Sequence, residues 1–303
     1  MTVTICSTAA RDLDEPLAGT ATRTVGYLVI EQPGSWGRDA LTGSDLDAVL
    51  GAQLKTQAAA ADVKVLLVRR PGPHPSRPIE RYEVLLAHVG PTPWMERCQL
   101  SAAELAHLDP AECAAPQPVG RGQATTSPRW LVCTHARRDR CCATLGRPIA
   151  DTLAALHPEQ TWEVSHLGGH RFAGTMLTLP EGLLYGNLDV AAAMEVVHAH
   201  TDGRVVADQL RGRVHLPPVA QVAEVAVRRA LGLDAIDAVD ITDVPVLPPA
   251  VDGSAVAVAA WAQGRQVQVR IRRVRDDAVR PSSCDGELEP LERLEVVDVE
   301  VVG

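Results

Sequence analysis

WLVCTHARRDRCC, at residues 130–142, and SHLGGHRF, at residues 165–172, are the two segments around which the chain is organised. Three of the seven cysteines lie in the first segment, at Cys133, Cys141 and Cys142, and the second carries His166 and His170. Thiolate sulfur and imidazole nitrogen are ligands for transition metals and iron–sulfur centres. The rest of the chain is therefore interpreted mainly as a scaffold for a site formed by these segments.

Two glycines separate the paired histidines. Gly168 and Gly169 disfavour a helix at this point. A tight glycine loop would instead turn both imidazoles toward one point and let the backbone approach a cofactor closely. His135 and His157 lack such a partner, and they are interpreted as structural residues.

Four kinds of site compete for the cysteines. A zinc site with two Cys and two His is one, although its sulfur ligands usually lie two to four residues apart, whereas eight or nine residues separate Cys133 from Cys141 or Cys142. A thioredoxin-type redox site needs a Cys-x-x-Cys motif, which the sequence lacks. A disulfide between Cys141 and Cys142 would leave Cys133 and both histidines unexplained. A two-iron cluster uses Cys133, one neighbouring cysteine and both histidines, which gives it a modest lead over zinc.

The flanking sequence predicts an α/β protein in which one order of elements occurs twice. In the first half we expect strands at residues 25–30, 63–68 and 82–88 and helices at 46–61 and 102–107. A Pro/Gly/Thr/Ser-rich linker follows at 115–128. In the second half we expect strands at 130–133 and 161–164, a hairpin at 176–185, and helices at 144–156 and 190–200.

The predicted domains follow from this repeat. They are a flexible N-terminal tail at residues 1–22, an N-terminal α/β domain at 23–125, a second α/β domain bearing the site at 126–203, and a C-terminal region at 204–303. The last region should contain a helix at 217–231 and strands at 255–262, 266–273 and 294–301.

Composition narrows the class of protein. The formal charge of −9 argues against nucleic-acid binding, and no apolar run approaches the ~20 residues of a membrane span. An odd number of cysteines and no secretory signal suggest a cytoplasmic protein with ligand or redox cysteines. We find neither a nucleotide-binding fingerprint nor a carboxylate pair suited to glycoside hydrolysis. The sequence therefore favours a protein other than an enzyme.

A longer motif resembles the sucrase/ferredoxin-like family. It consists of CTHARRDRCCATLGRP at residues 133–148, SHLGGHRFA at 165–173 and Tyr185-Gly186. EQPGSWG at 31–37 and LVRRPG at 67–72 look like the family's amino-terminal signatures, and RPSSC at 280–284 is similar to bacterial members. The resemblance covers residues 25 to 200.

This resemblance implies a thioredoxin-like-fold ferredoxin with a [2Fe–2S] cluster. The fold would then be two thioredoxin-like α/β units in tandem, followed by a small α+β C-terminal region. The implied cluster ligands are Cys133, Cys142, His166 and His170. Anchoring the motif on Arg138-Asp139 selects Cys142, with Cys141 as the alternative.

The implied function is that of an electron carrier or electron-transfer module that serves a redox partner protein. Its potential would lie within about −150 to +300 mV and fall with rising pH. Six arginines against four acids between residues 129 and 171 would suit an acidic partner. The alternative is a redox or metal sensor, or an interaction protein, with a Cys2His2 zinc site.

Overall fold

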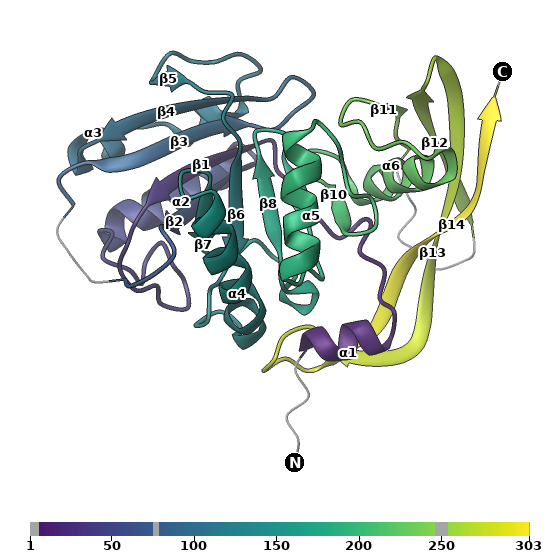
Figure 1. Cartoon of the computed structure of the whole chain (residues 1–303), viewed down its shortest axis with the longest axis horizontal. Helices are drawn as coiled ribbons and strands as arrows, with labels where there is room; N and C mark the ends of the chain where they lie inside the picture. Colours follow the sequence, from purple (N-terminus) through teal and green to yellow (C-terminus); the bar gives the residue numbers. More distant parts are fainter. Residues whose placement is uncertain (1–5, 75–78, 246–253, 303) are drawn as a thin grey trace.

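Two β-sheets organise the protein in the computed structural model, which describes residues 6–74, 79–245 and 254–302 (Figure 1). One sheet has ten strands and the other has four. The larger sheet includes strands from both halves of the predicted repeat, and the smaller one belongs to the C-terminal region. The prediction of a mixed α/β protein is confirmed.

The first half contributes five strands to the larger sheet. Its elements are β1 (Gly26–Glu31), α2 (Ala48–Ala60), β2 (Val63–Arg69), β3 (Tyr82–His88), β4 (Trp94–Leu100), α3 (Ala102–Ala106), η1 (Pro110–Ala114) and β5 (Gln123–Ala124). β2 is parallel to β1, and β3 is antiparallel to it. The side chain of Asp47 caps α2 by accepting from the Leu50 N–H. β4 was not predicted, because polar and charged side chains interrupt its apolar pattern.

The second half repeats this arrangement and carries the candidate site. Its elements are β6 (Arg129–Cys133), α4 (Arg140–Leu156), β7 (Thr161–Val164), η2 (His170–Phe172), β8 (Met176–Leu179), β9 (Leu183–Tyr185), α5 (Val190–Thr201) and β10 (Leu210–Arg213). β7 is parallel to β6, and β8 is antiparallel to it. α4 begins before the predicted residue 144, because the Asp139 carboxylate caps it by accepting from the Cys141 N–H at 2.9 Å. The early start places both neighbouring cysteines in the first turn of the helix.

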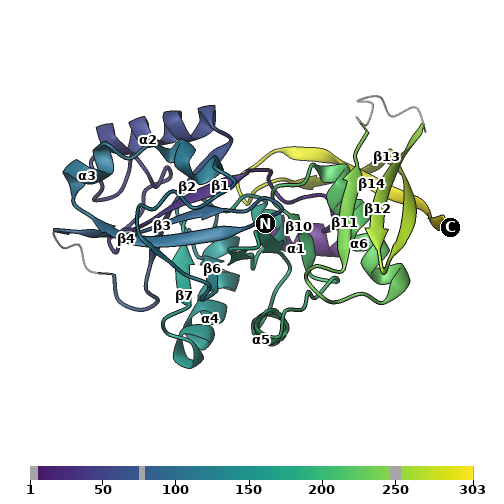
Figure 2. The same cartoon turned by 90° about the horizontal axis from the view of Figure 1, so that it is seen from above.

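β2 and β7 join the two halves into one sheet. They pair antiparallel at Val68 with Val164 and at Arg69 with Glu163, and the strand order is β10-β9-β8-β6-β7-β2-β1-β3-β4-β5. Figure 2 shows α2 on one side of this sheet and α4 and α5 on the other. The faces that these helices leave uncovered contribute to one shared hydrophobic core, which includes Cys133 and Cys142. The two predicted units are therefore continuous with each other.

The C-terminal region forms the second sheet, against which one helix packs. Its elements are α6 (Pro218–Leu231), β11 (Val239–Asp243), β12 (Ala255–Ala262), β13 (Arg265–Pro281) and β14 (Leu288–Val302), with strand order β11-β12-β13-β14. The region begins later than the predicted residue 204, because β10 pairs with β9 in the larger sheet. No helix in the described part of the chain is long and apolar enough to cross a membrane.

The N-terminal segment departs from the flexible tail predicted at residues 1–22. Residues 6–12 form α1 (Cys6–Asp12), with Cys6 fully buried. Beyond it, the Glu15 carboxylate accepts from Arg171 and from Arg280, each at 2.8 Å. Residues 1–5 lie outside the described part. The prediction was wrong for residues 6–22 because their partners are distant in sequence, so local composition carried no sign of them.

Candidate metal centre

Three of the four predicted ligands meet at one edge of the larger sheet. Cys133 ends β6, Cys142 lies in the first turn of α4, and His166 follows β7. Parallel strands have their carboxyl ends at the same edge of a sheet, and the connecting helix begins at that edge. The β6–α4–β7 unit therefore brings the three side chains together.

The distances define a compact group. The ligand atoms of Cys133, Cys142 and His166 all lie within 4.8 Å of one another. The His170 ring lies beside this group, with its centroid 5.1 Å from that of His166. Both sulfurs are buried, whereas the histidines are partly accessible. Cys141 belongs to a different group of side chains.

Glycines make this approach sterically feasible. A Cβ at Gly146 would lie 2.1 Å from the Cys133 carbonyl oxygen, so α4 can pack on the end of β6 only with glycine there. Gly168 and Gly169 have φ values of +89° and +68°, in the left-handed region that glycine adopts without strain. The predicted glycine loop between the histidines is therefore present, and η2 begins directly after it.

Arg211 stabilises this glycine loop through hydrogen bonds. Its buried guanidinium donates from Nη1 to the Gly168 carbonyl at 2.8 Å and from Nε to Thr20 Oγ1 at 3.0 Å. Burial lowers the pKa of Arg211 to about 9. Sequence reasoning missed this residue, because it lies on β10 and its sequence context carries no motif.

A hydrogen bond between Cys133 and Cys142 shifts the pKa values of the two thiols in opposite directions. The bond from the Cys142 thiol lowers the pKa of Cys133 well below its usual range, and His166 lowers it further. The same bond raises the pKa of Cys142. The lowered pKa of Cys133 favours its thiolate, which is the form that binds metals.

The histidines have nitrogen atoms available for a ligand. Nδ1 of His166 and Nδ1 of His170 are buried and have no hydrogen-bond partner among the described residues. Burial lowers the pKa of His170, whose Nε2 lies 3.9 Å from Asp139 Oδ2. Neutral imidazole is the form that binds a metal. Two cysteine sulfurs and two imidazole nitrogens match the donor sets of a [2Fe–2S] cluster or a zinc ion.

The other histidines considered from the sequence have structural contacts. His135 Nε2 lies 2.7 Å from the Gly37 carbonyl oxygen, and its ring contacts Trp36 edge-on at 5.7 Å. The His157 ring packs against Trp130 with centroids 5.0 Å apart. His135 thereby connects the two halves of the larger sheet.

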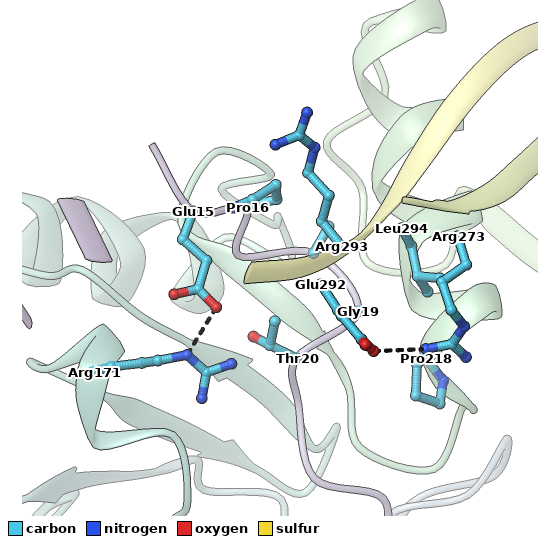
Figure 3. A pocket seen from close by; sticks show the side chains of 11 residues that line it. Glu15, Pro16, Gly19, Thr20, Arg171, Pro218, Arg273, Glu292, Arg293 and Leu294 are labelled. Atoms are coloured by element: carbon cyan, nitrogen blue, oxygen red, sulfur yellow. Dashed lines mark hydrogen bonds and ion pairs between the residues drawn. The ribbon is translucent and has the colours of Figure 1, made fainter. Parts of the chain in front are cut away.

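A pocket of about 270 Å³ lies between the N-terminal segment, α6 and β14, and Arg171, which follows His170 in the sequence, is among its lining residues (Figure 3). Its arginines are paired with carboxylates: Arg171 with Glu15 at 2.8 Å and Arg273 with Glu292 at 3.9 Å. Arg293 contacts Asp276 at 3.0 Å. Because these charges are balanced locally, we assign the pocket no charged substrate.

Fold and site together define an α/β protein with a candidate Cys/His metal centre at the edge of its main sheet. The family model described as sucrase/ferredoxin-like matches residues 17–212, and the chain belongs to this family. The match includes both halves of the larger sheet and all four predicted ligands. It ends within β10, so the four-stranded sheet lies beyond it.

Two curated relatives share part of the sequence. "Altered inheritance of mitochondria protein 32" of Eremothecium gossypii is 28% identical over 117 residues, which cover 34% of this chain and 37% of the relative. The protein of the same name from Candida glabrata is 27% identical over 103 residues, covering 29% and 33%. The chain thus spans about a third of the length of these relatives. No solved structure matches the chain significantly.

Proposed function

We propose that the protein is a [2Fe–2S] electron-transfer protein whose cluster is held by Cys133, Cys142, His166 and His170. The observation that carries the proposal is the convergence of Cys133, Cys142 and His166 within 4.8 Å. The His170 ring lies alongside them. When bound, such a cluster supplies reversible one-electron transfer.

The accessibility of the ligands suggests where a redox partner would dock. The sulfurs of Cys133 and Cys142 are buried, whereas the side chain of His170 is 16% exposed. The path from the site to solvent is therefore shorter on the side of the histidines than on the side of the cysteines. The exposed residues Arg137 and Arg138, in the connection before α4, would favour an acidic partner protein.

Two further assignments accompany this proposal. Within each half, a strand, a helix and a parallel strand are followed by antiparallel strands, which supports two thioredoxin-like units as the finer description of the fold. None of the seven cysteines is joined in a disulfide, which fits a reducing compartment such as the cytoplasm.

The decisive experiment is metal and sulfide analysis of freshly purified protein, with absorption and paramagnetic-resonance spectra. We expect a red-brown protein with equimolar iron and acid-labile sulfide, reducible by one electron per cluster. A colourless protein holding zinc at Cys133 and Cys142 would contradict the proposal and support the zinc alternative, a sensor or interaction protein.

One observation favours a sensor as the second candidate. Asp139, whose carboxylate lies 3.9 Å from His170 Nε2, also accepts from the Cys284 N–H at 2.8 Å. Cys284 belongs to the connection between β13 and β14. A change at the metal centre could therefore reach the C-terminal sheet. A partner that binds the loaded and metal-free forms with different affinity would support this candidate.

A further inference from the structure

A second group of metal-binding side chains lies on the other side of Asp139. The Sγ atom of Cys141 lies 3.5 Å from that of Cys6 and 3.1 Å from that of Cys284. The sulfurs of Cys6 and Cys284 are 3.7 Å apart. The Asp139 carboxylate completes the group, with Oδ1 3.0 Å from the Cys284 sulfur and 3.8 Å from the Cys6 sulfur.

Segments far apart in the sequence build this group. Cys6 begins α1, Cys141 lies in the first turn of α4, and Cys284 follows β13. Figure 1 shows α1 beside the bend that connects β13 to β14. The Glu15–Arg280 ion pair fastens these two segments together. The site is therefore a meeting point of the N-terminal helix, the cluster-bearing half and the C-terminal sheet.

This group shares no residue with the candidate cluster ligands. Successive residues of an α-helix point about 100° apart. Cys142 thus faces Cys133 and His166, whereas Cys141 faces Cys6 and Cys284. Ser7 donates a hydrogen bond to the Cys141 sulfur at 3.2 Å. The doubled cysteine supplies one sulfur to each group.

The spacing of the donor atoms suits a tetrahedral ion. With zinc–sulfur bonds of about 2.3 Å, tetrahedral geometry separates the sulfurs by about 3.8 Å. The observed separations of 3.1 to 3.7 Å approach this value. A disulfide would join only two of the three sulfurs and leave a third thiol beside the buried Asp139 carboxylate. One divalent cation would use all four groups and offset part of their negative charge.

We propose that Cys6, Cys141, Cys284 and Asp139 bind a zinc ion that joins the N-terminal helix and the C-terminal sheet to the cluster-bearing half. The site is closed by four protein ligands, which is typical of a structural zinc site. It shares no ligand with the proposed [2Fe–2S] cluster, and zinc binding here does not require that cluster.

The test is a Zn²⁺ titration of the full-length, metal-free, reduced chain against a chromogenic chelator. We expect Cys284→Ser to bind about one zinc fewer per chain than the wild type. Cys98→Ser is the matched control, because Cys98 is also a partly buried free thiol but lies on β4. Its zinc stoichiometry should equal that of the wild type.

A second measurement does not depend on a variant. Zinc should slow alkylation of Cys284 by N-ethylmaleimide about tenfold or more, while Cys98 reacts at an unchanged rate, because metal-bound thiolates are shielded. Mass spectrometry locates the label. Equal zinc binding by the wild type and Cys284→Ser, or loss of zinc in Cys142→Ser alone, would overturn the proposal. Absence of iron from the protein would leave it standing, since zinc is the readout.

Discussion

At the scale of single residues, the neighbours Cys141 and Cys142 belong to two different groups of candidate metal ligands. The Cys142 sulfur lies with Cys133 and His166, and the Cys141 sulfur lies with Cys6 and Cys284. Hydrogen bonding, in which Cys6 contributes most, lowers the pKa of Cys141 to about 6. Two adjacent cysteines of one helical turn therefore occupy chemically separate environments.

The serine variants of this pair should have opposite effects. We expect Cys142→Ser to lose the iron and visible absorption while retaining zinc at the second group. Cys141→Ser should lose that zinc and keep its iron and spectrum. Iron, sulfide and zinc analysis of both variants provides the measurement. Loss of iron in Cys141→Ser with a normal spectrum in Cys142→Ser would show that Cys141 is the cluster ligand.

At the scale of elements, a buried ion pair supports the seam between β2 and β7. Glu163 Oε2 accepts from Arg69 Nε at 2.8 Å and from Thr134 Oγ1 at 2.8 Å. Both charged side chains are less than 10% exposed. Only two residue pairs join these strands, so side chains contribute much of the contact between the halves.

Removing the charge of Glu163 should destabilise this seam. Glu163→Gln leaves the Arg69 guanidinium buried without a counter-charge, and we expect a loss of about 3–5 kcal/mol in the free energy of unfolding. Urea denaturation followed by circular dichroism measures it. The control is Glu159→Gln, because Glu159 is 78% exposed and lies 3.8 Å from Arg70. Its effect should be below about 1 kcal/mol, and equal losses in the two variants would contradict the argument.

At the scale of the whole molecule, Glu15 connects three distant parts of the chain. Its buried carboxylate accepts from Arg171 on η2 and from Arg280 on β13. Burial alone would raise the pKa of Glu15, but the hydrogen bonds and charges of the two arginines lower it overall. The folded protein therefore holds Glu15 ionised more strongly than the unfolded chain does.

This pKa shift predicts acid sensitivity. The stabilisation by Glu15 is fully present above the unfolded pKa of about 4.3 and is lost as the pH falls through the lowered folded-state pKa. Glu15→Gln should cost about 3 kcal/mol at pH 7, and its difference from the wild type should shrink below about pH 4.

Urea denaturation at pH 7 and at acidic pH tests this prediction, with Glu292→Gln as the control. Glu292 is 46% exposed and lies 3.9 Å from Arg273, so we expect an effect below about 1 kcal/mol. A Glu15→Gln cost that does not change with pH would contradict the role of the carboxylate charge.

The sequence by itself determined the elements whose patterns are local. The strands β6 and β7 followed from apolar runs, and the glycine loop after β7 followed from Gly168 and Gly169. The four predicted ligands were implied by the resemblance to the family, whose motif is also local. These features depend on neighbouring residues, whose side-chain spacing and backbone freedom can be deduced from a short segment.

Only the tertiary structure decided which distant segments meet. The packing of α1, the continuity of the ten-stranded sheet, and the contacts of Arg211 and Glu15 depend on partners far away in the sequence. The group around Cys141 also depends on distant partners, because Cys6 and Cys284 lie near opposite ends of the chain. Burial of paired charges and thiols fixes these contacts, and no local pattern encodes which partners will share a buried site.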